Sequence, residues 1–164
     1  MLSSEEPNTK LIGIFGGSFD PIHNGHTQII SSLLDKIPFD EIKIIPCGLP
    51  AHRSLICSAK DRIEMVRLAF SKIKKISIDD REIMREGFTF SIDTVKELKK
   101  EFPEKVSFVW IMGEDAFQKI DTWHMWKNFI NQIHIIVISR PNPEALSSDV
   151  VIKVCKGSFL FSSE

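Results

Sequence analysis

The chain has 164 residues, of which 43% are hydrophobic and 26% charged, and its formal net charge is −1 at pH 7. This composition is typical of one globular domain over residues 1–164 with a polar tail at 1–10, and the balanced charge excludes a global basic field for nucleic acid or anionic membranes. Three cysteines without a C-x-x-C pair disfavour a disulfide framework or a zinc knuckle, so we expect a cytoplasmic protein. No apolar run approaches the length of a membrane span, so we expect no membrane partner.

Strand and helix signals alternate along the chain. Residues 11–15 predict a first strand, and the apolar stripe of residues 25–36 predicts a helix that Asn24 can cap. Ser58, with Asp61 three residues later, predicts the start of another helix. Further strands are expected at 41–46, 75–79, 106–112, 133–139 and 150–155, further helices at 58–73, 91–102 and 113–131, and irregular segments at 47–57, 81–88 and 140–149. The alternation predicts an α/β fold with a doubly wound, mostly parallel sheet and helices on both faces.

Polar strings follow four of the expected strands. GGSFDPIHNGH follows the first, CGLPAHR the second, GED follows VSFVWIM, and SRP follows IHIIVI. Ligands of open α/β sheets bind outside the carboxyl ends of the strands. The four strings therefore predict one site at one edge of the sheet.

The first string has the features of a phosphate site. Gly16 and Gly17 have no Cβ, so a ligand can approach the backbone closely, and a helix N-terminus follows them. His23 and His26 add hydrogen-bond donors. The same histidines could form half of a metal site, but no carboxylate or thiol cluster nearby completes one, so phosphate binding is favoured and no protein metal ligand is expected.

GGSFDPIHNGH resembles the G-x-F-D-P-x-H-x-G-H signature of the nucleotidyltransferase α/β-phosphodiesterase superfamily, and its wording is most similar to that of the nicotinate-nucleotide adenylyltransferases. The resemblance implies a Rossmann-like fold and adenylyl transfer from ATP to nicotinate mononucleotide, with Mg²⁺, giving deamido-NAD and pyrophosphate. His23 and His26 match the catalytic histidines that stabilise charge at the α-phosphate. The implied ATP-binding residues are Gly16, Gly17, Ser18, Phe19, His23, His26, Gly113, Asp115 and Arg140.

Two further strings and a tryptophan resemble the acceptor side of these enzymes. LPAHR is similar to P-P-H-R with Ala51 in place of the second proline, and residues 85–94 are similar to R-x-G-x-S-Y-T-x-D-T. In the family, backbone N–H groups at the tyrosine–threonine pair receive the nicotinate carboxylate, and a tryptophan stacks on the pyridine ring. The alternative for Ser91 is a simple helix N-cap. The implied mononucleotide-binding residues are Pro50, His52, Arg53, Phe90, Ser91 and Trp123.

The tail departs from the family pattern. An I-S-S-T-x-I-R string normally binds ATP phosphates there, whereas this chain ends Phe161-Ser162-Ser163-Glu164 with no arginine after the serines. We therefore expect a truncated or degenerate relative. The alternatives are a nucleotide-binding relative with reduced or no turnover and an adenylyltransferase for nicotinamide mononucleotide. A dinucleotide-dependent oxidoreductase is disfavoured because no G-x-G-x-x-G follows the first strand. The sequence gives no indication of oligomeric state.

Overall fold

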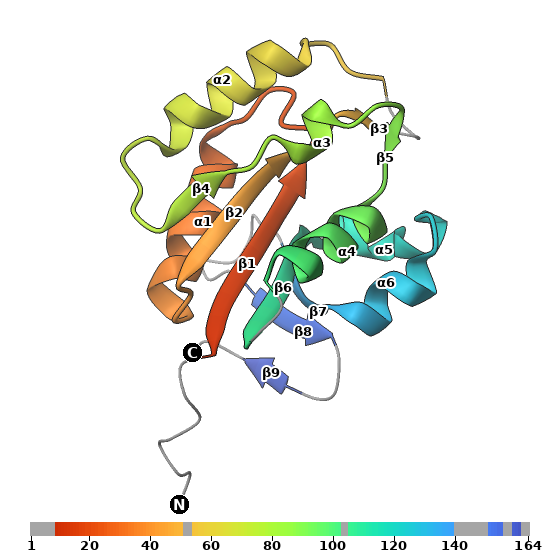
Figure 1. Ribbon diagram of the computed structural model, residues 1–164. Coiled ribbons are helices and arrows are strands. Elements are labelled where there is room, and N and C mark those ends of the chain that lie inside the picture. The colour runs from red at the N-terminus through yellow and green to blue at the C-terminus, as the bar shows by residue number, and fades with distance from the viewer. Residues whose placement is uncertain (1–8, 51–53, 103–104, 140–150, 156–158, 162–164) are drawn as a thin grey trace, which may run out of the picture.

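The computed structural model describes residues 9–50, 54–102, 105–139, 151–155 and 159–161, and Figure 1 shows how its elements are arranged. The strands are β1 (Lys10–Gly17), β2 (Glu41–Pro46), β3 (Leu49–Pro50), β4 (Ile76–Ile78), β5 (Phe88–Thr89), β6 (Val106–Gly113), β7 (His134–Ser139), β8 (Val151–Cys155) and β9 (Phe159–Phe161). The helices are α1 (Asn24–Lys36), α2 (Ala59–Phe70), α3 (Arg81–Met84), α4 (Ser91–Glu101), α5 (Glu114–Gln118), the 3₁₀ turn η1 (Ile120–Thr122) and α6 (Trp126–Gln132).

The main sheet has the strand order β4-β2-β1-β6-β7-β8-β9. Strands β4, β2, β1, β6 and β7 are parallel, whereas β8 runs antiparallel to β7 and β9 antiparallel to β8. A separate small sheet pairs β3 with β5. The chain moves outward from β1 through β2 to β4 and then crosses back to β6, so the order reverses between β1 and β6. The predicted α/β fold with a mostly parallel sheet is confirmed, and this reversal is where such sheets bind ligands.

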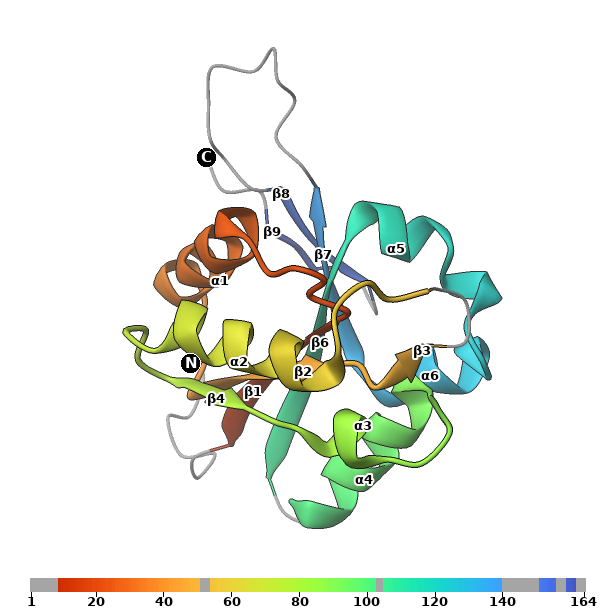
Figure 2. The ribbon, with the colours of Figure 1, turned by 90° about the horizontal axis from the view of Figure 1, so that it is seen from above.

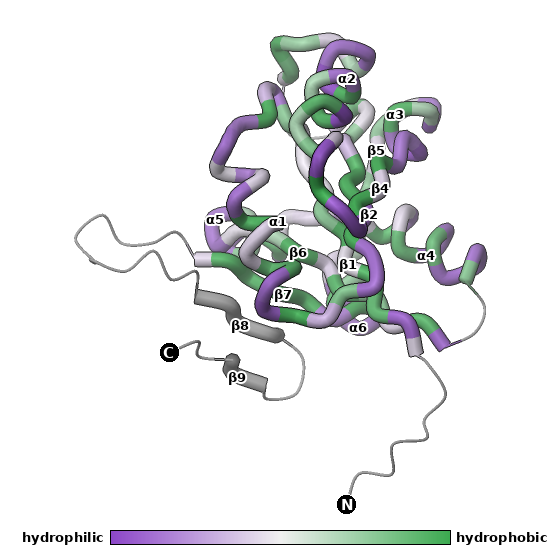
Figure 3. The backbone as a smooth tube through the Cα atoms, turned by 90° about the vertical axis from the view of Figure 1, so that its left-hand side faces the viewer, coloured by the Kyte–Doolittle hydropathy of each residue, from purple (hydrophilic) through white to green (hydrophobic). Residues whose placement is uncertain are grey.

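Helices cover both faces of the sheet, as Figure 2 shows from above. On one face, α1 and α2 pack Ile30, Leu33, Val66 and Phe70 against the strands. On the other face, α4 and α6 contribute side chains that include Leu98. Because the central strands are covered on both sides, they read as nearly continuous apolar runs, which appear green in Figure 3.

Several expected boundaries hold and others do not. Ser58 caps α2 as predicted, with its Oγ accepting a hydrogen bond from the Asp61 N–H at 3.1 Å, but the helix ends at Phe70 rather than near residue 73. The segment 113–131 forms three pieces, because Met125 adopts a left-handed conformation with φ 51° before α6. Residues 81–88, expected to be irregular, contain α3. In the described part of the chain, no helix is long and apolar enough to cross a bilayer.

Candidate active site

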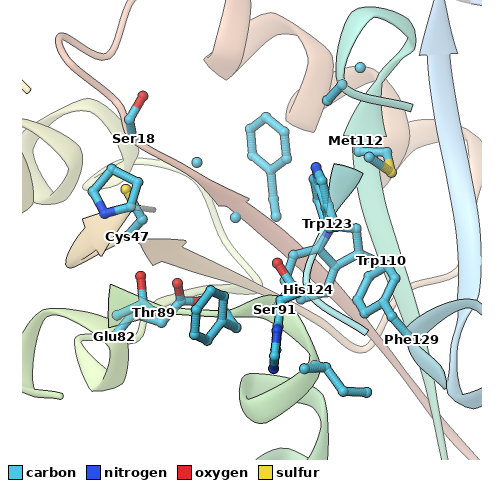
Figure 4. Close-up of a pocket in the computed structure, with 18 residues that line it drawn as sticks. Ser18, Cys47, Glu82, Thr89, Ser91, Trp110, Met112, Trp123, His124 and Phe129 are labelled. Carbon is cyan, nitrogen blue, oxygen red and sulfur yellow. The ribbon is translucent and has the colours of Figure 1, made fainter. Parts of the chain in front are cut away.

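A cavity of about 350 Å³ lies beyond the carboxyl ends of β1 and β6. Figure 4 shows Ser18 and Cys47 at one side of it, and Trp110, Trp123 and Phe129 at the other. Residues expected at the two substrates meet in its wall, as the convergence of the polar strings predicts. The expected residues that line it are Gly16, Gly17, Ser18, Pro50, Phe90, Ser91, Gly113 and Trp123.

The other expected residues that the structure describes are not part of the lining. Phe19 is 3% exposed and packs in the apolar core beside the cavity. Asp115 lies in the first turn of α5 and is not among the lining residues. His23 and His26 are also not among the lining residues. The centroid of the His26 ring lies 6.1 Å from that of Phe15, which does line the cavity. His52, Arg53, Arg140, Ser162 and Ser163 lie outside the described residues.

The glycine turn is shaped by aromatic packing. A Cβ on Gly16 would lie 3.2 Å from the Trp110 ring, and one on Gly17 would lie 3.2 Å from the Phe19 ring. Both distances are tighter than ordinary van der Waals contact, so a larger residue at either position would require the aromatic ring to shift by a few tenths of an ångström. These contacts explain the two glycines without a ligand, and the close approach of phosphate stays a prediction.

The two histidines begin α1 as a reciprocal pair. The expected cap, Asn24, is instead the first helical residue, and His23 is the N-cap. The Gly25 N–H donates to His23 Nδ1 at 3.1 Å, while the His23 N–H donates to His26 Nδ1 at 3.1 Å. This is a capping box made by imidazoles three residues apart, and the two rings stack with centroids 3.8 Å apart.

This arrangement determines which ring nitrogens can donate. Each Nδ1 accepts a backbone N–H, so in the neutral rings the proton is on Nε2. Burial and the neighbouring His23 ring lower the pKa of His26 to about 4, from an ordinary value of 6.5. His26 is therefore a neutral imidazole at pH 7 that presents an Nε2–H donor.

The acceptor side centres on the start of α4. Phe90, with φ −123° and ψ 136°, is the N-cap, and no side chain caps the helix. Ser91 is therefore the first helical residue rather than the cap, and its N–H and that of Ile92 have no partner in the helix ladder. Both residues line the cavity. The His124 ring, also in the lining, packs on Phe90 with ring centroids 4.3 Å apart.

Glu82 is a lining residue that the sequence analysis did not find. Its side chain is 5% exposed, and the Thr94 hydroxyl donates to its Oε2 at 2.9 Å. Burial raises the pKa of the Glu82 carboxyl to about 7. Figure 4 shows it next to Thr89 at the edge of the cavity. The only sequence signal was an acidic residue in a charged segment, which is usually solvated.

The pKa of His26 predicts a pH-dependent stability difference between the wild-type protein and His26→Asn, whose amide oxygen can replace Nδ1 as an acceptor. Folded His26 binds fewer protons than unfolded His26 between pH 4 and 6.5, so its contribution is present above pH 6.5 and is lost as the pH falls through that range. The free energy of unfolding of the wild type relative to His26→Asn should therefore rise from pH 4 to 6.5 and then level off.

Urea unfolding of both proteins across this range measures the difference. The subtraction is needed because Glu82, with its raised pKa, acts in the opposite direction and loses its contribution as the pH rises towards 7. A difference in unfolding free energy that stays constant from pH 4 to 8 would contradict the assignment of a low pKa to His26.

Among the described residues, no group of three or more His, Cys, Asp or Glu side chains is arranged to hold a metal ion.

The chain was compared with known proteins. The cytidylyltransferase-like family profile matches residues 14–163. A probable nicotinate-nucleotide adenylyltransferase of Marinomonas sp. is 37% identical over 134 residues, covering 81% of this chain and 61% of the relative. One from Neisseria meningitidis serogroup C is 39% identical over 132 residues, covering 80% and 66%. The chain thus spans about three fifths to two thirds of the length of these relatives.

Solved structures are also similar. Nicotinic acid mononucleotide adenylyltransferase of Plasmodium falciparum, complexed with NaAD, superposes with a TM-score of 0.74 at 25% identity, covering 83% of this chain and 67% of that one. A putative nicotinate-nucleotide adenylyltransferase from Vibrio parahaemolyticus, at 19% identity and a TM-score of 0.65, covers 79% and 74% and shows the common fold. The family profile matches nearly the whole chain, and the sheet reversal and the cavity agree with that match. The chain therefore belongs to the cytidylyltransferase-like family.

Proposed function

We propose that the chain transfers the adenylyl group of ATP to nicotinate mononucleotide, giving deamido-NAD and pyrophosphate, in cytoplasmic NAD biosynthesis. One observation carries the proposal: a single cavity joins the glycine turn of β1 to the uncapped start of α4 and to Trp123. The names of the matched relatives and the NaAD complex of the Plasmodium falciparum enzyme support it.

The ATP side needs donors rather than a base. The attacking oxygen is the phosphate of the mononucleotide, which is already ionised, so catalysis requires positioning and stabilisation of the charge on the phosphoryl oxygens. The histidine pair offers Nε2–H donors at the N-terminus of α1, whose dipole attracts anions. Mg²⁺ enters with ATP and screens the charge of the triphosphate.

The acceptor side distinguishes a carboxylate from an amide. The N–H groups of Ser91 and Ile92 at the start of α4 can donate to both oxygens of a carboxylate, whereas an amide would place its own N–H₂ donors against one of them. Trp123 packs against Trp110 with ring centroids 6.3 Å apart. Trp123 also lines the cavity, where its ring can stack on a pyridine ring.

The proposal is tested by incubating the protein with ATP, Mg²⁺ and either mononucleotide, and by measuring pyrophosphate and dinucleotide. We expect turnover with nicotinate mononucleotide and a much lower kcat/KM with the amide. ATP binding without turnover would instead identify a nucleotide-binding relative, and turnover only with the amide would overturn the choice of acceptor.

Trp123→Ala should raise the KM for nicotinate mononucleotide roughly tenfold with a smaller change in kcat, because an aromatic stacking partner is lost. Steady-state kinetics with saturating ATP measure the effect. Trp126→Ala is the matched control, since Trp126 begins α6 and is not part of the cavity lining. An unchanged KM in Trp123→Ala would count against stacking.

A further inference from the structure

Arg62 is a buried cation that the reaction described above does not use. It lies in the first half of α2 and is 1% exposed. Its Nη1 donates to the carbonyl oxygens of Ser18 at 2.8 Å and Cys47 at 2.7 Å, and its Nη2 donates to that of Gly48 at 3.3 Å. None of the ion pairs among the described residues includes Arg62.

The direct partners of this buried guanidinium are neutral carbonyl groups, and the nearby Asp20 carboxylate forms no ion pair with it among the described residues, so its burial needs an explanation. Removing a charge from water is unfavourable, and an apolar residue of similar volume often stabilises a core equally well. Within the part of the chain that the structure describes, moreover, the Arg62 Nε has no hydrogen-bond partner. Core stability alone therefore does not account for an arginine at this position, whereas its three carbonyl partners come from loops that shape the cavity.

Those loops form one side of the cavity, opposite Trp110 and Trp123. Ser18 follows β1 and Cys47 follows β2, and both line the cavity, whereas Arg62 does not. Carbonyl oxygens that bond to Arg62 are therefore directed away from the cavity. Because the C=O and N–H of a trans peptide point in opposite directions, this orientation also keeps partial negative charge away from the place where phosphates would bind.

The loop after β2 is also held by contacts other than those with Arg62. A Cβ on Gly48 would lie 2.1 Å from the backbone oxygen of Glu82, so the chain passes directly against α3 there. The Cys47 N–H also donates to the Gly17 carbonyl at 2.8 Å. Arg62 thus completes a set of contacts that holds the two loops to each other and to α3.

We propose that Arg62 is a positioning residue for the anionic substrate: by drawing the carbonyl oxygens of Ser18, Cys47 and Gly48 out of the cavity, it keeps the turn after β1 and the loop after β2 in the arrangement that accepts a triphosphate. This inference rests on the proposed function and deepens it. The loop arrangement that we propose would favour any polyphosphate anion. Binding of inorganic tripolyphosphate can therefore be measured as a test that does not depend on turnover.

The test compares Arg62→Met and Arg62→Lys with Arg67→Met. Arg67 lies on the same helix with an exposed side chain that pairs with Glu64 at 3.2 Å, so it controls for charge loss on α2. Tripolyphosphate binding, the KM for ATP and kcat are measured below the melting temperature of each variant. We expect Arg62→Met to weaken tripolyphosphate binding and to lower kcat/KM for ATP by about tenfold or more, since small misplacements of a binding loop are costly.

Lysine keeps the charge but cannot span three carbonyls with one nitrogen, so Arg62→Lys should recover only part of the loss. A lower melting temperature with unchanged tripolyphosphate binding and kcat/KM in both variants would overturn the proposal and leave Arg62 a structural residue. If Arg62→Met does not fold, unchanged values in Arg62→Lys do the same. If the wild type transfers adenylyl groups and the Arg62 variants are unaffected, only this inference is contradicted. If the wild type binds tripolyphosphate but transfers nothing, only the proposed function is contradicted. If the wild type neither binds tripolyphosphate nor transfers adenylyl groups, both are contradicted.

Discussion

Replacing His26 by asparagine should lower kcat/KM for adenylyl transfer by about 10²–10³-fold, the usual loss when one donor to a developing anion is removed. The asparagine oxygen can still accept the His23 N–H that His26 Nδ1 accepts at 3.1 Å, so the start of α1 keeps its cap. What disappears is the Nε2–H donor. The expected result is therefore an inactive protein with a melting temperature close to that of the wild type.

Two further variants test the donor. Glutamine at position 26 can accept the His23 N–H through its Oε1, as in a standard capping box, and can place its amide N–H₂ near the position of Nε2. His26→Gln should therefore be about as stable as His26→Asn and more active. His134→Ala is the control, because His134 is exposed at the first residue of β7, the end of that strand away from the cavity. Near-normal turnover in His26→Asn would rule out a donor role for His26.

Replacing Ser91 by proline should raise the KM for nicotinate mononucleotide by about 10–100-fold, because a hydrogen bond to a charged group contributes about 1.5–3 kcal/mol and proline has no N–H. The helix should tolerate the change. Ser91 is the first residue of α4, the position where proline is favoured. The preceding residue, Phe90, already has the extended conformation that proline requires of its neighbour.

Ser91→Ala is the matched control, since it removes the hydroxyl and keeps the N–H. If the backbone receives the carboxylate, Ser91→Ala should bind nicotinate mononucleotide nearly as the wild type does, and Ser91→Pro should also show a smaller preference for the acid over the amide. Both KM values are obtained at saturating ATP, and the far-UV circular dichroism spectrum of each variant checks that it folds. An equal loss in the two variants would point to the hydroxyl, and no loss in either would remove this helix start from the acceptor site.

The fold and part of the site could be predicted from local patterns in the sequence. The apolar run of β6 marks a strand covered on both faces, and the helical spacing of Ile92, Val95 and Leu98 marks the buried side of α4. The direction of β8 was not predictable from its own residues. Pairing with β7 depends on which strand edge is open, and that is a property of the assembled sheet.

At the helix start near the histidines, two local patterns compete for the N-cap position. Asparagine is among the best N-caps, so Asn24 was the reasonable expectation. The structure places His23 there instead, because His26 lies three residues later and its Nδ1 can accept the His23 N–H. Because His23 and His26 are only three residues apart, their spacing was a local signal that could have predicted a capping box.

By itself, the sequence determined the order of the longer strands and helices, the glycine turn and the spacing of the two histidines, because periodicity, turn conformation and capping depend on residues a few positions apart. The short elements β3, α3, β5 and β9 were not predicted. Only the tertiary structure decided that Glu82 and Arg62 point inward. Arg62 finds its partners at Ser18, 44 residues earlier, and at Cys47, 15 residues earlier. A charged side chain is buried when distant backbone carbonyls replace its water, and no local pattern records where those carbonyls will lie.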